Sequence, residues 1–398
     1  MNYVFISPHF PQTYWNFCDR LKKLGNHVLG IGDCPYEMLS EELRNALTEY
    51  YRVDSMEDYD QMVKAVGYFT YRYGKIDWLE SNNEYWLEQD ARLRTDFHIT
   101  TGLQENEIHS FKLKSAMKAL YEQAGVPVAR YHLVDTLENG LHFIEEVGYP
   151  VIVKPDNGVG AAATYKLKNE ADVKAFYERE WPTQYIMEEF IDGILESYDG
   201  IADSKRNPLF EVSHHFPTPI MDIVNDQMDL YYYTKKIIEP DLLEVGRRVI
   251  KAFPTNSRFF HCEFFRLKKA KKGLGKKGDI VGLEVNMRTP GGYTPDMMNF
   301  QGSCDVYQAF AEMVTFDTSN VKQKHDQFCV FASRRDGKCY QHSLEEIQDC
   351  YGSRLLWHDR MPDILSGAMG NDFYVAICKS KKEVEEFAKY IHEKGELA

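Results

Sequence analysis

The chain has 398 residues, of which 43% are hydrophobic and 27% charged, and it carries a formal net charge of −14 at pH 7. At roughly 100–200 residues per domain, this length predicts two to four domains, and the composition is typical of a folded, water-soluble protein rather than a disordered one. The acidic charge disfavours binding to nucleic acid and to anionic membranes.

The eight cysteines contain no CxxC pair, so the pattern indicates free thiols in a reducing compartment rather than a metal site. The N-terminal segment has neither a basic lead nor a long apolar stretch. No window approaches the roughly 18 uninterrupted apolar residues of a spanning helix. We therefore expect a cytoplasmic protein without a membrane anchor.

Residues 1–105 are predicted to form an α/β lobe. Apolar runs at Tyr3–Ser7 and His27–Ile31 flank a stretch with helical spacing at Thr13–Leu24, and the order strand, helix, strand favours a parallel sheet. Further helices and short strands are expected at 37–47, 51–53, 59–73 and 77–80.

Residues 106–320 are predicted to form an α+β domain. A helical pattern at His109–Gln123 stops at Gly125–Pro127, and the β-branched run Pro150–Lys154 leads directly into a glycine-rich loop. Other expected elements lie at 130–134, 137–147, 165–167, 171–179 and 185–190.

Two later apolar runs, Phe259–Leu267 and Ile280–Asn286, are joined by a lysine- and glycine-rich loop, and this pattern predicts an antiparallel hairpin. Residues 321–398 are expected to form a small closing α/β subdomain. Its predicted strands lie at 328–331 and 373–378, and its final helix lies at 383–393.

The second strand of this hairpin carries the sharpest local pattern. Alternation along a strand sends Glu284, Asn286 and Arg288 to one face. Carboxylate and amide oxygens beside an arginine match a magnesium ion bridged to phosphate, because Mg²⁺ prefers a few protein oxygens together with phosphate oxygens. The alternative is the solvent-facing polar side of an edge strand.

Glu263 lies on the first strand of the hairpin, among four phenylalanines. A carboxylate in such surroundings is costly unless it is paired or binds a metal. The alternative to a metal is a salt bridge to Arg258 or Arg266. For His261, a hydrogen-bonded position in the core is as consistent with the pattern as an active role.

Lys154 ends a buried strand and precedes a loop of small residues, 158–163. Backbone amides approach phosphates closely where side chains are absent, and a lysine supplies compensating charge. The loop is neither GxxxxGK[ST] nor GxGxxG. Lys114, on the helix before Gly125, is a second candidate cation, with a solvated lysine as the alternative.

The segment Met187–Gly193, followed by Glu196, combines an apolar strand with an acidic end. Such an edge can bind adenine through backbone groups while a carboxylate accepts from the ribose hydroxyls. Without further support, the same pattern fits an ordinary acidic strand end.

Taken in chain order, five pieces resemble the ATP-grasp superfamily, and within it the carboxylate-amine ligase type. They are the segments 114–127, 153–160, 188–193, 261–263 and 284–288. The resemblance covers residues 109–300. It implies an N-terminal parallel α/β lobe, an ATP-grasp fold with two α+β subdomains that clamp ATP, and a small C-terminal subdomain.

The resemblance also implies a role for each matching residue. The phosphate contacts would be Lys114, Lys154, Gly158, Gly160, Ala161 and Ala162. The adenine contacts would be Glu188, Glu189, Phe190 and Ile191, and the ribose contact would be Glu196, whose register after Gly193 is open. The ligands of Mg²⁺, or alternatively Mn²⁺, would be Glu263, Glu284 and Asn286. The catalytic residues would be Arg288 and Lys154.

The implied activity is that of an enzyme that activates a carboxylate as an acyl phosphate with Mg-ATP and joins it to an amine. Amino-acid or peptide-like substrates are favoured, with residues 289–293 as part of the acceptor pocket. The alternatives are a carboxylase or carbamoyl-phosphate-type enzyme and a non-catalytic nucleotide-binding protein.

The expected partners are a small-molecule carboxylate and an amine, with no nucleic acid and no membrane; a homodimer is left open. Nucleic-acid binding could arise only from the basic run Lys268–Lys277, for which a solvated hairpin tip is the favoured interpretation.

Overall fold

The computed structural model describes residues 1–158 and 163–395. Its N-terminal lobe holds a parallel sheet with the strand order β3-β2-β1-β4, as the alternation of strands and helices predicted. The strands are β1 (Asn2–Ile6), β2 (His27–Gly32), β3 (Glu49–Arg52) and β4 (Trp78–Glu80). The helices are α1 (Trp15–Lys23), α2 (Glu41–Ala46), α3 (Tyr59–Tyr73) and α4 (Leu87–Asp96).

A second, antiparallel sheet has the strand order β5-β8-β6-β7. Its strands are β5 (Tyr131–Leu133), β6 (Val151–Pro155), β7 (Tyr165–Leu167) and β8 (Tyr185–Glu189). Helices α7 (Leu137–Val147) and α8 (Glu170–Tyr177) belong to the same part of the chain.

The helix predicted at 109–123 is divided into α5 (His109–Lys112) and α6 (Lys114–Gln123). At Leu113 the backbone is extended, with φ −91° and ψ 117°, and this residue forms a bridge with Asn157. The amide of Lys114 donates to the carbonyl of Asp156 (3.0 Å), and the Asp156 carboxylate accepts from the amide and the hydroxyl of Ser115 (2.8 and 2.7 Å). The break therefore ties the start of α6 to the loop after β6.

The largest sheet is antiparallel and has the order β13-β12-β9-β10-β11-β14-β16-β15. The first five strands in sequence are β9 (Gly193–Ala202), β10 (Pro208–Phe216), β11 (Tyr231–Thr234), β12 (Arg258–Leu267) and β13 (Ile280–Asn286). The others are β14 (Phe328–Arg334), β15 (Leu355–Arg360) and β16 (Asp372–Cys378). The predicted β12–β13 hairpin is confirmed, and the C-terminal strands extend the same sheet.

The remaining helices connect or follow the strands of this sheet along the chain. They are α9 (Ile220–Asn225), α10 (Pro240–Ala252), α11 (Thr294–Gly302), α12 (Val306–Phe316), α13 (Leu344–Tyr351), α14 (Asp363–Met369) and α15 (Lys381–His392). None of the helices within the described ranges is long and apolar enough to cross a membrane. The predicted domain limits, at 105 and 320, stay predictions.

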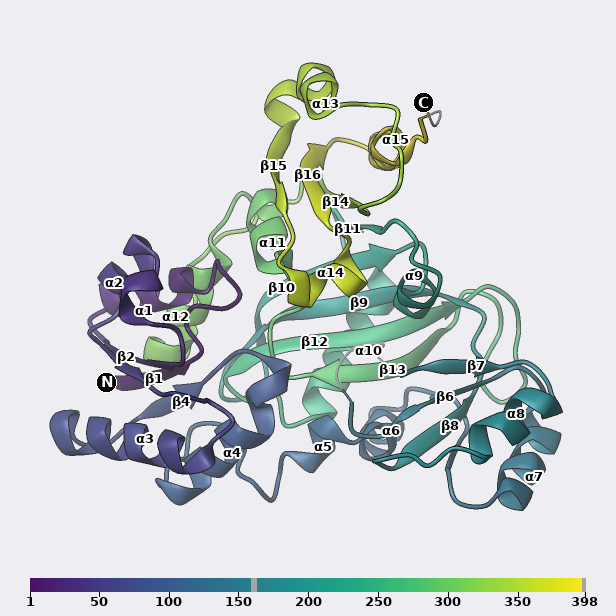
Figure 1. Cartoon of the computed structure of the whole chain (residues 1–398), viewed down its shortest axis with the longest axis horizontal. Coiled ribbons are helices and arrows are strands. Elements are labelled where there is room, and N and C mark those ends of the chain that lie inside the picture. Colours follow the sequence, from purple (N-terminus) through teal and green to yellow (C-terminus); the bar gives the residue numbers. More distant parts are fainter. Residues whose placement is uncertain (159–162, 396–398) are drawn as a thin grey trace.

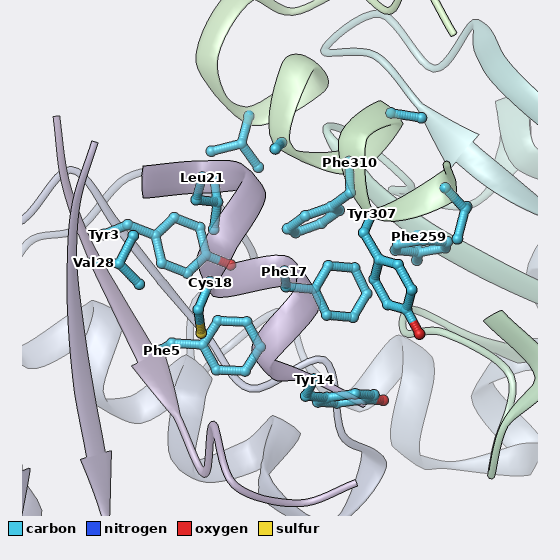
Figure 2. Packing of buried hydrophobic residues seen from close by; sticks show 14 of the residues in the cluster. Tyr3, Phe5, Tyr14, Phe17, Cys18, Leu21, Val28, Phe259, Tyr307 and Phe310 are labelled. Atoms are coloured by element: carbon cyan, nitrogen blue, oxygen red, sulfur yellow. The ribbon is translucent and has the colours of Figure 1, made fainter. Parts of the chain in front are cut away.

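Figure 1 shows the N-terminal lobe and the β5–β8 sheet at opposite sides of the molecule, with the large sheet between them. An aromatic seam joins the lobe to this sheet (Figure 2). The ring of Phe17 on α1 packs edge-on against Phe259 on β12 and against Tyr307 and Phe310 on α12, at centroid distances of 5.8, 4.7 and 5.1 Å. The seam is fully buried, so the lobe and the large sheet share one core.

Candidate nucleotide and metal site

A cavity of about 380 Å³ lies between the β5–β8 sheet, helix α6 and the β12–β13 hairpin. The structure brings most of the predicted site residues to its walls. Those that line it are Lys114, Lys154, Glu188, Glu189, Phe190, Ile191, Glu263, Glu284, Asn286 and Arg288. Residues predicted from separate stretches of sequence thus meet at one place.

Glu196 is not among the described residues that line the cavity. It lies on β9, where its carboxylate accepts from Lys235 Nζ (2.5 Å) and Arg266 Nε (2.8 Å). Burial raises the pKa of Glu196, but the hydrogen bond from His215 and the charges of Lys235 and Arg266 outweigh burial and lower it to about 2. The ribose role of Glu196 stays a prediction.

The predicted phosphate-covering loop is described only in part. Gly160, Ala161 and Ala162 lie outside the described residues. At its start, the carbonyl of Gly158 accepts a hydrogen bond from Lys114 Nζ (3.0 Å). Lys114 Nζ also lies 3.8 Å from Glu284 Oε2, so this lysine bridges the loop and the acidic hairpin.

Two buried lysines share one carboxylate in the middle of the cavity. Lys118 Nζ and Lys154 Nζ lie 2.5 and 2.7 Å from the two oxygens of Glu188. Burial raises the pKa of Glu188, but the two lysines outweigh it and lower the pKa to about 2. Two cations on one anion leave this part of the cavity with a net positive charge, which suits a polyanionic ligand.

Lys118 was missed from the sequence, although a signal for it exists. It follows Lys114 by one helical turn, and residues four apart on a helix share a face. The side chain of Lys118 is almost fully buried, and a buried lysine requires an anionic partner.

The candidate metal ligands lie on neighbouring strands. Glu263 and Glu284 are directly opposite in the β12–β13 register. Asn286 Nδ2 donates to Glu284 Oε1 (3.3 Å), which leaves the buried Asn286 Oδ1 without a hydrogen-bond partner among the described residues. Burial raises the pKa of Glu284, and the nearby carboxylates of Glu84 and Glu263 add to this effect against the charge of Lys114.

A divalent cation would relieve this carboxylate repulsion and would occupy the orphaned amide oxygen, so the donor set fits Mg²⁺. In the described part of the chain, no group of three or more His, Cys, Asp or Glu side chains could hold a metal. The two carboxylates and one amide would therefore need phosphate oxygens and water to complete the coordination of Mg²⁺.

The backbone that carries these ligands is irregular. The β12–β13 register shifts between Glu263 and Phe264. The buried hydroxyl of Tyr121, on α6, is the donor to the carbonyl oxygens of Glu263 (3.1 Å) and Glu284 (2.9 Å) at this shift. Helix α6 thus contributes lysines to one side of the cavity and fixes the backbone of the ligand strands on the other.

Glu263 is paired with neither of the arginines considered from the sequence. Its Oε1 lies 3.2 Å from His261 Nε2, and the other ring nitrogen of His261 pairs with the buried Asp199. Burial lowers the pKa of His261, but Asp199 and Glu263 outweigh it and raise the pKa to about 10. His261 is therefore a hydrogen-bonded buried histidine that orients a candidate metal ligand.

Arg288 pairs with Glu84, which comes from the short 3₁₀ turn after β4 in the N-terminal lobe. Burial raises the pKa of Glu84, but Arg288, Lys112 and Lys114 outweigh it and lower the pKa. The sequence offered no signal for Glu84, because it lies 204 residues from its partner. An anion that approaches Arg288 must compete with this carboxylate.

The segment predicted as part of the acceptor pocket is tethered to the N-terminal lobe. The hydroxyl of Thr289 lies 2.7 Å from that of Tyr14, which donates to the carbonyl of Asn82 (2.9 Å). Residues 289–293 are not among the described residues that line the cavity. Their acceptor role stays a prediction.

The site is a central cavity between two antiparallel sheets, with cations on one wall and an acidic hairpin on the other, and this arrangement matches the fold expected from the resemblance to the ATP-grasp superfamily. Residues 113–204 match the family model "Carbamoyl-phosphate synthase L chain, ATP binding domain". The chain is also similar in fold to an L-amino acid ligase from Bacillus licheniformis, with a TM-score of 0.73, 15% sequence identity, and coverage of 98% of this chain and 96% of that one. The predicted resemblance to the ATP-grasp superfamily, and to its carboxylate-amine ligase type, is confirmed.

Similar sequences include a carbamoyl phosphate synthase and an amino acid ligase. The carbamoyl phosphate synthase large chain of Thermus thermophilus is 22% identical over 138 residues, which make up 31% of this chain and 13% of that protein. The L-arginine-specific L-amino acid ligase of Bacillus subtilis is 22% identical over 280 residues, which make up 68% of this chain and 65% of that protein. The chain thus spans about an eighth of the synthase and about two thirds of the ligase.

Proposed function

We propose that the protein is a Mg-ATP-dependent ligase that activates a substrate carboxylate as an acyl phosphate and joins it to an amine. The observation that carries this proposal is the cavity itself. Lys154 and Lys118 line one wall of the cavity, and Glu263, Glu284 and Asn286 line another. A polyphosphate and its metal therefore have complementary partners in one space.

In the proposed reaction, an oxygen of the substrate carboxylate attacks the terminal phosphorus of ATP, and ADP leaves. The amine nitrogen then attacks the acyl carbon, the bond to phosphate breaks, and the nitrogen loses a proton. Positioning and charge stabilisation supply most of the catalysis in such phosphoryl transfers.

Each part of the cavity has a role in this proposal. Lys114 and Lys154 hold the phosphates, and the segment 188–191 holds adenine. The Mg²⁺ held by Glu263, Glu284 and Asn286 neutralises phosphate charge when it is bound. Arg288 stabilises the transferred phosphate once the incoming anion displaces Glu84.

We propose an amino acid or a short peptide as the carboxylate substrate. The names of the similar ligases support this class, because one is an L-arginine-specific L-amino acid ligase and another is a D-alanine–D-alanine ligase from Clostridium perfringens, 32% identical over 102 residues. That second match covers 25% of this chain and 33% of the ligase.

The test is ADP release by the purified protein in Mg-ATP, across a grid of amino acids and other carboxylates with and without added amines and bicarbonate. One acid–amine pair should raise turnover, and Glu284→Gln should abolish it, whereas the exposed surface variant Glu345→Gln should match the wild type. Turnover that requires bicarbonate but does not require an acid–amine pair would favour a carboxylase. ATP binding without turnover on any pair would refute the ligase assignment in favour of nucleotide binding alone.

A further inference from the structure

The tip of the β12–β13 hairpin, residues 268–275, lies against the wall of the cavity. It belongs to the basic run for which a solvated tip was expected from the sequence. Leu274 is buried, with 7% of its surface exposed, in a cluster with Ile191 and Val281. The tip closes on itself through paired backbone hydrogen bonds between Lys271 and Gly275 (2.9 and 3.0 Å). The tip is therefore anchored to the cavity wall through Leu274, while residues 268–270, 272 and 273 are exposed as expected.

The tip contacts four consecutive residues of the cavity wall, 189–192. Lys271 Nζ lies 3.2 Å from Glu189 Oε2 and donates to the carbonyl of Phe190 (2.6 Å). The next residue, Ile191, packs with Leu274. Asp192 then accepts from the backbone amide of Lys268 (3.0 Å) and pairs with Lys269 Nζ (3.2 Å).

Lys271 holds this wall together with Arg130. Arg130 donates to Glu189 through its backbone amide (2.9 Å), Nε (3.1 Å) and Nη2 (2.9 Å), and the Glu189 side chain has no exposed surface. Burial raises the pKa of Glu189, but hydrogen bonds from Arg130 and the charge of Lys271 outweigh burial and lower it. Glu189 is thus occupied by two cations of the protein, and a ligand would meet the backbone of its segment and not its carboxylate.

Part of the positive charge of the basic run is neutralised within the chain. Lys269 and Lys271 face carboxylates of the same chain. Such neutralisation lowers the positive potential that a nucleic acid would require. The observations therefore favour a role in the cavity over a nucleic-acid surface.

We propose that the hairpin tip is the outer support of the nucleotide-base pocket and that Lys271 is a positioning residue for it. Lys271 holds the segment 189–192 through the Glu189 carboxylate and the Phe190 carbonyl, and so sets the affinity for the base without contacting the phosphates. This inference rests on the proposed function, because it requires adenine at residues 188–191.

The test measures binding of three probes by calorimetry in the presence of Mg²⁺: ADP, adenosine and inorganic tripolyphosphate. Lys271→Met should weaken ADP and adenosine about tenfold, the effect of losing about 1.4 kcal/mol, and leave tripolyphosphate binding unchanged. Lys271→Arg, which keeps the charge and the donors, should restore most of the affinity. The matched control is Lys272→Met, which removes the same charge from an exposed neighbour and should leave all three probes at their wild-type affinities.

Equal weakening of tripolyphosphate and ADP would overturn the inference, because it would show a general charge effect. Wild-type ADP binding in Lys271→Met would also overturn it, while leaving the ligase proposal intact. If the wild-type protein binds tripolyphosphate but neither ADP nor adenosine, the adenine assignment fails, and the proposed function fails with it.

Discussion

Tyr121→Phe tests whether helix α6 fixes the backbone of the candidate metal ligands. The substitution removes only the hydroxyl that donates to the carbonyls of Glu263 and Glu284. The ring contacts with Phe253 and Phe264, at centroid distances of 5.2 and 5.9 Å, are available to phenylalanine as well.

The magnitude follows from burial. Tyr121 has no exposed surface, and the bonds from its hydroxyl to the two carbonyl oxygens are part-buried. A typical intramolecular hydrogen bond contributes about 0.5–1.5 kcal/mol to stability, and we expect the free energy of unfolding to fall by about 1 kcal/mol on this basis. Burial raises the pKa of the Tyr121 hydroxyl well above its ordinary value, so the donor is present throughout the neutral range and the loss should not vary with pH there.

Urea unfolding of the two proteins measures this difference, with an unchanged dependence on urea concentration as the sign that the unfolded state is unaffected. Tyr71→Phe is the matched control, because Tyr71 is 92% exposed, and it should change stability by less than about 0.5 kcal/mol. A stability loss in Tyr121→Phe no larger than that of the control would refute the role given to the hydroxyl.

Three further changes address the same molecule. Gly282→Ala should lower the free energy of unfolding by about 1–3 kcal/mol in urea, because the added Cβ would lie 2.5 Å from the ring of Tyr121; wild-type stability would contradict the packing. Glu188→Gln should lower the free energy of unfolding by about 3 kcal/mol at pH 7, because the pKa of Glu188 falls from 4.5 to about 2 on folding. The stabilisation by Glu188 is therefore present above pH 4.5. The difference in stability between variant and wild type should shrink as pH falls toward 2. Asp296→Asn should stabilise the protein by up to about 3 kcal/mol at pH 8. Burial raises the pKa of Asp296 from 3.8 to about 6, so the folded state loses stability as pH rises across that range. Thermal unfolding at pH 4 and pH 8 should show the gain only at pH 8.

Elements with a strong local pattern were predictable from the sequence. Helix α3 and strand β13 have the predicted limits, Tyr59–Tyr73 and Ile280–Asn286, because apolar periodicity reports directly which face is buried. The break at Leu113 was not predictable, because the flanking residues keep a helical pattern and the cause, a bridge to Asn157, comes from a distant loop.

The same distinction separates the site residues that the sequence predicted from those that it did not. The hairpin acids and Lys154 stand out because each is polar within an apolar strand. Glu84 and Lys118 carry no such contrast, since Glu84 lies in a turn and the signal for Lys118 is only the helix face that it shares with Lys114. Their importance comes from their partners, Arg288 and Glu188, and pairing across long sequence distances is decided by the tertiary fold.

The aromatic seam between the N-terminal lobe and the large sheet limits how the chain can be divided. A fragment that ends at residue 105 would retain Phe17 and lose Phe259, Tyr307 and Phe310, the three rings that cover it. The fragment would present a large apolar face to water, and such faces promote aggregation. Loss of the lobe would expose the opposite side of the same seam, so the lobe and the sheet should unfold together as one cooperative unit and should resist exchange as separate modules.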